Sequence, residues 1–152
     1  MSAAVAAIRP GQPSDAAAIL ALEALFPGDR MSARSVRRFL RVPTAQVLVA
    51  EGDDGSVLGN LIWLRRRGSR RARIYSVVVA PQARGLGLGR RLVETMQRQA
   101  LAAGCDTATL EVRADNAAAR ALYAALGYRE DAALPGYYED GGDGLRLARG
   151  LG

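Results

Sequence analysis

The chain has 152 residues, of which 49% are hydrophobic, and its net charge of +6 comes from 21 arginines against 15 acidic residues, because it contains no lysine. This length suits a single domain over residues 1–152, and no run approaches the roughly 18 apolar residues of a membrane span. Residues 1–4 lack a signal-peptide pattern, and the lone Cys105 cannot form an internal disulfide, so we expect a cytoplasmic protein. Since the chain has no histidine, we expect no metal site, and catalysis has to use carboxylates, tyrosine, backbone groups or water.

The first half of the chain predicts three strands and two helices. A short strand over 5–8 precedes a helix that Ser14 or Asp15 caps and that ends before Pro27-Gly28. Ser32 caps a second short helix, which Pro43 stops. Residues 46–50 and 57–64 then alternate as two antiparallel strands around the turn at 53–55.

The second half predicts strands alternating with helices. We expect strands over 74–79 and 107–112, each followed by a helix, over 87–103 and from Asn116 to Leu126. Gly127 ends the second of these helices, and strands over 128–132 and 145–148 close the chain. Cys105 stands at a strand start, where a small buried side chain is expected.

Arginines are concentrated between the third and fourth predicted strands. Six of them stand close together: Arg65, Arg66, Arg67, Arg70, Arg71 and Arg73. One interpretation is a solvated hairpin, and the other is a patch for nucleic acid, the ribosome surface or an acidic protein. No aromatic residue interleaves the cluster to stack bases, which argues against nucleic acid as a substrate.

A glycine-rich turn follows the fourth strand. Three valines lead to Pro81, glycines stand at 85, 87 and 89, and an amphipathic helix pattern then begins. Glycines let backbone N–H groups converge on phosphate oxygens, and a helix N-terminus adds partial positive charge. A P-loop would need a lysine, and a dinucleotide fingerprint would need a third glycine where Leu92 stands. The pattern therefore predicts a different phosphate loop.

Two sequence blocks carry a family resemblance. The spacing of Arg84, Gly87 and Gly89 resembles the acetyl-coenzyme A pyrophosphate loop of the GNAT (general N-acetyltransferase) superfamily. The segment Leu-Glu-Val-Arg over 110–113, with Asn116 and the later Leu-Tyr and Leu-Gly-Tyr steps, resembles bacterial ribosomal-protein alanine N-acetyltransferases. The resemblance implies an α/β fold with a mixed, mostly antiparallel seven-stranded sheet flanked by four helices. In that fold the fourth and fifth strands splay apart at the cofactor.

The resemblance also assigns the acetyl-CoA site. The pantetheine arm would lie along one strand, and the loop backbone would hold the pyrophosphate, with two arginines adding charge and Asn116 contacting the cofactor. The implied cofactor-binding residues are Val77, Val78, Val79, Arg84, Gly85, Leu86, Gly87, Leu88, Gly89, Arg90 and Asn116. Leu86 departs from the polar residue common in this loop, which leaves the backbone role intact.

Catalytic roles follow from the same resemblance. Glu111 matches the family's general base and should point away from the core face that Leu110 and Val112 occupy. Tyr123, twelve residues later, matches the general acid for the thiolate. Alternative bases are Glu23, Glu139 and Asp140.

The function expected from the sequence is acetyl transfer from acetyl-CoA to a primary amine, and the expected acceptor is a protein N-terminal α-amine of the ribosomal-protein alanine type. A small amine (polyamine, amino acid or aminoglycoside) or a protein lysine is the alternative acceptor, and a non-catalytic coenzyme A sensor is the alternative of another class. The aromatic and acidic loop that begins with Tyr137 and Tyr138 would border the acceptor site or be a solvated turn. No membrane partner is expected.

Overall fold

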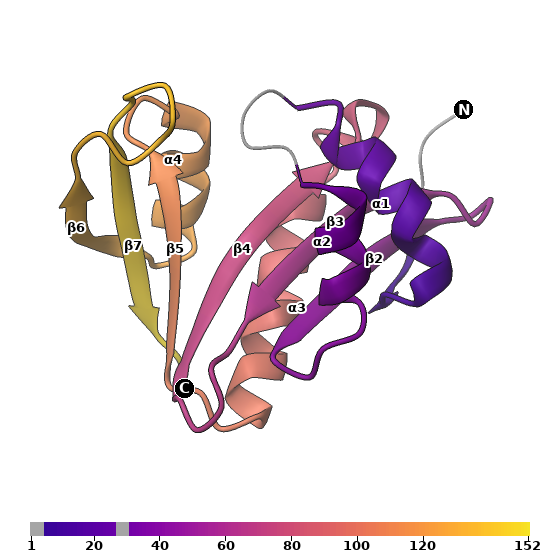
Figure 1. Cartoon of the computed structure of the whole chain (residues 1–152), viewed down its shortest axis with the longest axis horizontal. Helices are drawn as coiled ribbons and strands as arrows, with labels where there is room; N and C mark the ends of the chain where they lie inside the picture. The colour runs from indigo at the N-terminus through magenta and orange to yellow at the C-terminus, as the bar shows by residue number, and fades with distance from the viewer. Residues whose placement is uncertain (1–4, 27–30) are drawn as a thin grey trace.

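A computed structural model describes residues 5–26 and 31–152, and these form a seven-stranded sheet between two pairs of helices (Figure 1). The strands are β1 (Val5–Pro10), β2 (Ala45–Gly52), β3 (Val57–Leu64), β4 (Arg71–Val79), β5 (Thr107–Arg113), β6 (Arg129–Leu134) and β7 (Gly144–Gly150). The helices are α1 (Ala16–Glu23), α2 (Ala33–Phe39), α3 (Leu88–Ala102) and α4 (Ala117–Ala125), with short 3₁₀ turns η1 (Pro13–Asp15) and η2 (Pro81–Ala83). The expected fold class is confirmed, although the 3₁₀ turns were not predicted. Pro27-Gly28, expected to end the first helix, lies outside the described residues.

The sheet has the order β1-β2-β3-β4-β5-β7-β6, and its strand pairs are antiparallel except for β4 and β5. This parallel pair runs only from Arg71 opposite Thr107 to Ile74 opposite Leu110. A parallel pair needs a long crossover, and α3 provides it. Beyond Ile74 the two strands separate (Figure 1), so the predicted splay is confirmed.

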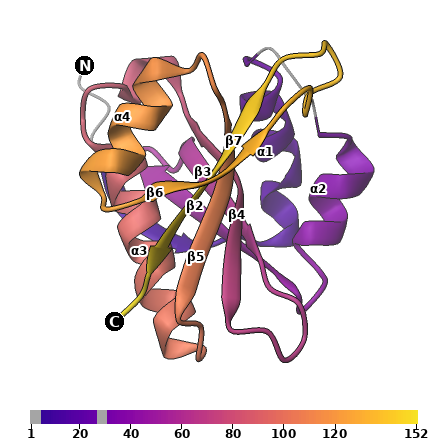
Figure 2. The same ribbon diagram turned by 90° about the vertical axis from the view of Figure 1, so that its left-hand side faces the viewer.

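Two helices cover each face of the sheet (Figure 2), with α3 and α4 on one side and α1 and α2 on the other. The amphipathic side of α3 buries Leu88, Leu92, Val93, Met96 and Ala100 against the sheet. Removing this apolar surface from water is the main source of stability for such a layered domain. In the part of the chain that the structure describes, no helix is long and apolar enough to cross a membrane.

A register shift in β4 reverses which side chains face which helices. Ile62 pairs with Ser76 and Trp63 with Ile74, so Tyr75 is an extra residue in β4. Before the shift, Ile74 packs into the α3 side, whereas after it Val78 packs with Leu22 of α1. The shift therefore turns Ser76 and Val78 toward α1.

The fourth strand is longer than predicted. Arg71 and Arg73, which the sequence analysis placed in the hairpin, lie in β4, where they alternate with the buried Ala72 and Ile74. Residues 65–70 form the connection. The arginine cluster is thus partly a strand face, which fixes the direction of its last two side chains.

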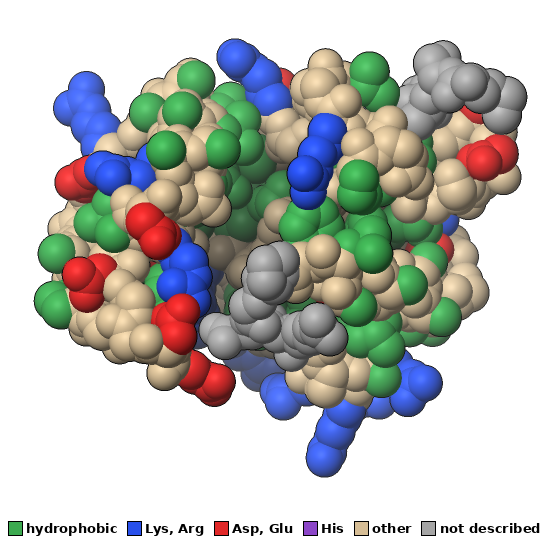
Figure 3. Space-filling model, turned by 90° about the horizontal axis from the view of Figure 1, so that it is seen from above, with side chains coloured by type: hydrophobic (Ala, Val, Ile, Leu, Met, Phe, Trp, Pro, Cys, Tyr) green, Lys and Arg blue, Asp and Glu red, His purple; other side chains and the backbone are tan. Residues whose placement is uncertain are grey.

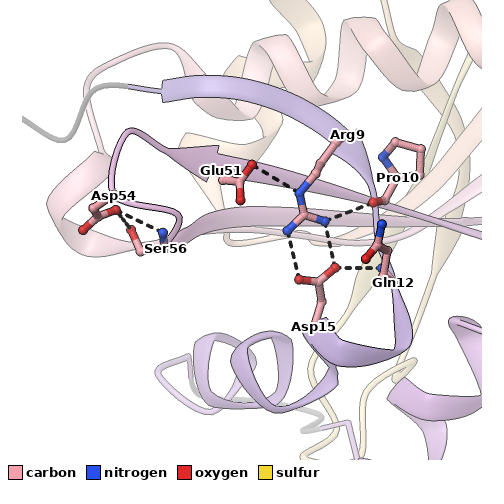
Figure 4. A network of polar contacts seen from close by, with 7 residues as sticks. All are labelled: Arg9, Pro10, Gln12, Asp15, Glu51, Asp54 and Ser56. Atoms are coloured by element: carbon pink, nitrogen blue, oxygen red, sulfur yellow. Dashed lines mark hydrogen bonds and ion pairs between the residues drawn. The ribbon is translucent and has the colours of Figure 1, made fainter.

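The N-terminal edge of the sheet is held by a polar network (Figure 4). Ser14 or Asp15 was predicted to cap the first helix; Asp15 stands at the N-cap of α1, but its side chain forms no cap bond there. Its buried carboxylate instead accepts two hydrogen bonds from Arg9, at 2.8 and 3.0 Å, and one from the Gln12 N–H at 2.7 Å. Arg9 also pairs with Glu51 at 3.4 Å. This network joins β1 to the start of α1.

Candidate active site

The gap between β4 and β5 opens onto a hollow in the surface. Viewed from above the separated strand ends, this hollow lies between the two halves of the molecule and is lined by hydrophobic side chains (Figure 3). Past Ile74, β4 pairs with β3 alone, with Val77 opposite Leu61 and Val79 opposite Gly59. Among the strands of the described residues, none pairs with the backbone groups on the β5 side of this segment. An extended ligand rich in amides could add to that edge as a strand does.

The glycine loop has the geometry of an anion site. Gly85 and Gly87 adopt left-handed conformations, with φ of 82° and 70°, and an added Cβ at either would meet nothing within 4 Å. Gly87 is the N-cap of α3, whose first backbone bond runs from Arg91 N–H to the Gly87 carbonyl at 3.1 Å. Helix geometry therefore leaves the preceding N–H groups of the first turn free for an anion. These residues fit a pyrophosphate.

Side chains around the loop are mostly exposed. The Arg84 guanidinium lies 5.2 Å from the centre of the Phe26 ring, and Arg90 pairs with Glu94 at 3.8 Å within α3. Leu86 is 50% exposed. A charge contribution from Arg84 and Arg90 to cofactor binding stays a prediction.

The start of α3 lies close to both β4 and α4. A Cβ added at Gly89 would be 3.8 Å from Val79 and 3.9 Å from Leu122. Asn116 caps α4 as predicted, because its Oδ1 accepts the Ala119 N–H at 3.1 Å. Contact between Asn116 and the cofactor remains a prediction.

Tyr123 is buried on the α4 side of the sheet. It is 6% exposed, and its ring meets that of Tyr128 edge to face at 5.5 Å. Burial raises the pKa of the Tyr123 phenol above its ordinary value near 10. A phenol with a raised pKa is protonated at neutral pH and can donate that proton to a developing anion.

Glu111 lies on the other face of β5. Leu110 and Val112 are buried in the core, so the predicted alternation is confirmed. The Glu111 carboxylate contacts Arg73 through two nitrogens, at 2.8 and 3.3 Å, and accepts the Tyr137 hydroxyl at 3.3 Å. Its side chain is 10% exposed. These partners fix the carboxylate in one orientation.

The two predicted catalytic residues therefore lie on opposite faces of the sheet. Tyr123 packs with the core cluster on the side of α3 and α4, and Glu111 points to the side of α1 and α2. Such an arrangement suits a group transfer between two reactants in which the attacking reactant loses a proton to a base and the leaving group takes a proton from an acid.

The partners of two candidate bases, Glu111 and Glu23, were not predicted from the sequence. Arg73, the partner of Glu111, was assigned to the hairpin, and pairing it with Glu111 requires the β4–β5 register. Glu23, an alternative base, accepts the Ser76 hydroxyl at 2.6 Å and lies 3.5 Å from Asn60 Nδ2. The β4 register shift, which turns Ser76 toward α1, has no signal in the sequence.

The other alternative bases lie in the loop before β7. Asp140 pairs with Arg113 at 2.9 Å, and the Gly142 N–H together with Arg113 holds its pKa below the ordinary value. Glu139 is exposed. Tyr137 and Tyr138 meet edge to face at 5.1 Å, and Arg113 lies 4.4 Å from the centre of the Tyr138 ring. Of these two acidic residues, Asp140 is thus already paired with an arginine.

Comparison with known proteins gives consistent matches. The acetyltransferase (GNAT) family pattern matches residues 17–128. An uncharacterized N-acetyltransferase of Methanocaldococcus jannaschii is 37% identical over 97 residues, which are 63% of this chain and 61% of that protein. The [ribosomal protein bS18]-alanine N-acetyltransferase of Escherichia coli is 42% identical over 67 residues, 44% of this chain and 45% of that protein. Each of these matches spans less than two thirds of the curated relative.

Solved structures extend the likeness to nearly the whole chain. The crystal structure of the ribosomal-protein-S18-alanine N-acetyltransferase from Escherichia coli superposes with a TM-score of 0.85 and 26% identity, covering 95% of this chain and 93% of that one. Ard1 from Thermoplasma volcanium, at 24% identity and a TM-score of 0.84, shows the same fold. The family pattern covers most of the chain, and the strand separation, glycine loop and sheet order agree with it. The chain belongs to the acetyltransferase (GNAT) family.

Proposed function

We propose that this enzyme transfers the acetyl group of acetyl-CoA to a protein N-terminal α-amine, with Glu111 as base and Tyr123 as acid. The observation that carries the proposal is the Glu111 carboxylate, which Arg73 and Tyr137 hold on the α1/α2 face just beyond the last paired residues of β4 and β5. Similarity to an enzyme named for ribosomal-protein alanine supports the acceptor class.

Backbone groups bind the cofactor in this proposal. The α3 N-terminus and the left-handed glycines at 85 and 87 accommodate the pyrophosphate, and the open edge of β4 beyond Ile74 binds the pantetheine amides. Acetyl-CoA supplies the thioester. An N–H on the β4 edge donates to the thioester oxygen and stabilises the charge that develops there.

Glu111 removes the proton that the amine loses, directly or through a water molecule. With reference pKa values near 8 for an α-amine and 10.4 for lysine, deprotonation at pH 7 costs about 1.4 and about 4.6 kcal/mol. A single oriented carboxylate is therefore better matched to an α-amine. The carbon–nitrogen bond forms as the carbon–sulfur bond breaks, and Tyr123 gives its proton to the departing thiolate.

Coenzyme A thiol release tests this proposal. The panel contains peptides with different N-terminal residues, N-terminally blocked lysine peptides, polyamines, amino acids and aminoglycosides, each with acetyl-CoA. We expect turnover of peptides that begin with a small residue such as alanine or serine. Turnover confined to small amines or to lysine would overturn the acceptor class. Cofactor binding without turnover on any acceptor would favour the sensor alternative.

A further inference from the structure

A groove of about 830 Å³ runs across the α1/α2 face from the connection between β3 and β4 to Glu111. Its walls come from α2, the β3–β4 connection, β4, β5 and β7, which are distant in the sequence. Besides Arg73, six arginines line this arginine groove: Arg38, Arg65, Arg66, Arg67, Arg71 and Arg146. Arginine side chains project from the same face in the space-filling view (Figure 3, lower edge).

The carboxylates of the described residues leave most of the charge of the arginine groove unpaired. Among the lining residues the carboxylate is that of Glu111, and Arg73 already pairs with it. None of the other six arginines forms an ion pair with a carboxylate of residues 5–26 or 31–152. Like charges held together repel one another, so an anionic occupant is stabilised there.

One of these arginines is held in place. Arg65 donates from Nε to the Ser69 carbonyl at 2.7 Å and from Nη1 to the Ala103 carbonyl at 2.6 Å.

Arg146 stands directly opposite Glu111 in the β5–β7 register. The cationic lining therefore continues up to the carboxylate that we assign as the base.

Apolar side chains form part of the same lining. Phe39, Val42 and Leu64 belong to the groove, and the Phe39 ring packs against Tyr75 at 5.0 Å. These two rings contact each other and do not stand apart as stacking platforms for successive bases. A peptide, with alternating backbone and side chains, suits such a mixed surface better than a nucleic acid.

We propose that the arginine groove binds an acidic segment of the acceptor protein, located shortly after the N-terminal residue that is acetylated. This inference rests on the proposed function, because the groove ends at Glu111, so a chain whose amine reaches Glu111 can continue into it. Carboxylates of the acceptor pair with the unneutralised arginines, and guanidinium groups bind carboxylates well through paired N–H donors. The enzyme would thus select acceptor proteins by the negative charge of the residues that follow their N-terminus.

Matched peptides test this inference. Three peptides share the same first two residues and differ at positions 3–8, which are acidic, neutral or basic. Acetyl transfer is followed as kcat/KM in about 50 mM salt, and binding is followed separately by fluorescence anisotropy with the same peptides. The variants are the double charge reversal R38E/R71E and, as a matched control, R98E, since Arg98 is exposed on α3 on the other face and bonds Thr95 of its own helix.

We expect the native enzyme to prefer the acidic over the neutral peptide by about tenfold or more, with the basic peptide poorest. The preference should shrink to about twofold in 0.5 M salt, because screening weakens exposed charge pairs. R38E/R71E should reduce the preference for the acidic over the neutral peptide to about twofold, because two of the unpaired arginines become carboxylates. Misfolding would instead lower kcat/KM for all three peptides alike and leave the preference unchanged. R98E should keep the native order.

Each other outcome has a defined meaning. Equal kcat/KM for the three peptides would overturn the acidic-segment inference and leave the proposed function standing. Arginine-dependent binding of the acidic peptide without acetylation of any peptide would do the reverse. If a single-stranded RNA oligonucleotide bound native enzyme and R98E but not R38E/R71E, while peptide charge had no effect, the groove would be a nucleic-acid surface and the inference would be wrong.

Discussion

In the active site that we propose, the cofactor side and the acceptor side, as assigned above, differ in which chemical groups form them. The cofactor side consists of main-chain groups from one continuous segment, the end of β4, the glycine loop and the first turn of α3. The acceptor side consists of side chains from α1, α2, β4, β5 and the loop before β7. Binding of a ligand by main-chain groups requires a particular backbone conformation, which glycines within the same segment specify. Side-chain chemistry demands strand register and packing, which depend on the whole fold.

The largest expected effect is on the acceptor side, at Glu111. Glu111→Gln should lower kcat/KM by about 10³-fold, because a positioned general base contributes roughly 10²–10⁴-fold. The Kd for acetyl-CoA, measured by calorimetry, should change little, since the cofactor side is main chain. Glu139→Gln is the matched control, because Glu139 is an exposed acid that the sequence offered as an alternative base. Equal losses in both variants, or none in either, would remove Glu111 from its role.

The next largest effect is expected at Tyr123, the proposed acid. Tyr123→Phe should lower kcat by about 10²-fold with the fold intact, because the ring keeps its packing and the proton donor is lost. Since burial raises the pKa of Tyr123, the native enzyme should lose no activity through its ionisation up to pH 10, where an ordinary phenol is half ionised.

Tyr128→Phe provides the control for that variant. Tyr128 is also buried, and its hydroxyl accepts a hydrogen bond from Gln97 at 2.8 Å. It should lose stability without a comparable loss of kcat. If Tyr128→Phe proved the slower enzyme, the assignment of the acid would be wrong.

A smaller effect is expected from a single methyl group on the cofactor side. Alanine in a left-handed conformation costs about 1–2 kcal/mol. Gly87→Ala and Gly55→Ala should both be destabilised by that amount, since both have positive φ, 70° and 83°, and open space around them. Gly55 lies in the β2–β3 turn, so only Gly87→Ala should raise KM for acetyl-CoA, by about five- to tenfold. Equal KM values would show that the loop backbone does not bind the cofactor.

The predictability of the structure follows the same division. The caps at Ser32 and Asn116 and the strand–turn–helix geometry of the glycine loop were predicted correctly, because each depends on neighbouring residues. Family resemblance supplied Glu111, and strand alternation gave its direction. Arg73 and Ser76 could not be placed, because their contacts depend on the β4–β5 register and on the shift at Tyr75.

One local signal was misinterpreted rather than absent. The run Arg71-Ala72-Arg73-Ile74 alternates charged and apolar residues, which is a strand pattern, yet the density of arginines indicated a hairpin. The arginines indicated an exposed segment, and the face of the strand that carries them is exposed in part, whereas the other face is buried. The arginine groove also includes Arg38 of α2 and Arg146 of β7, which the fold, and not the local sequence, brings to the same surface as Arg71.

The smallest effect on catalysis is expected at the far edge of the sheet, where Asp15→Asn should change stability alone. Arg9 and the Gln12 N–H lower the pKa of Asp15 in the folded protein (Figure 4). Charged hydrogen bonds of this kind contribute about 1.5–3 kcal/mol, and Asn can replace only part of them. A lowered pKa means that the ionised Asp15 stabilises the fold above the ordinary value near 3.9 and loses this contribution as pH falls through the folded value. Urea unfolding should therefore show a constant deficit for Asp15→Asn at pH 5–8 that narrows below pH 4, with kcat/KM unchanged. A change in kcat/KM would mean that the β1 edge positions the acceptor side through α1, and the β1 edge would then have to be counted as part of the acceptor side.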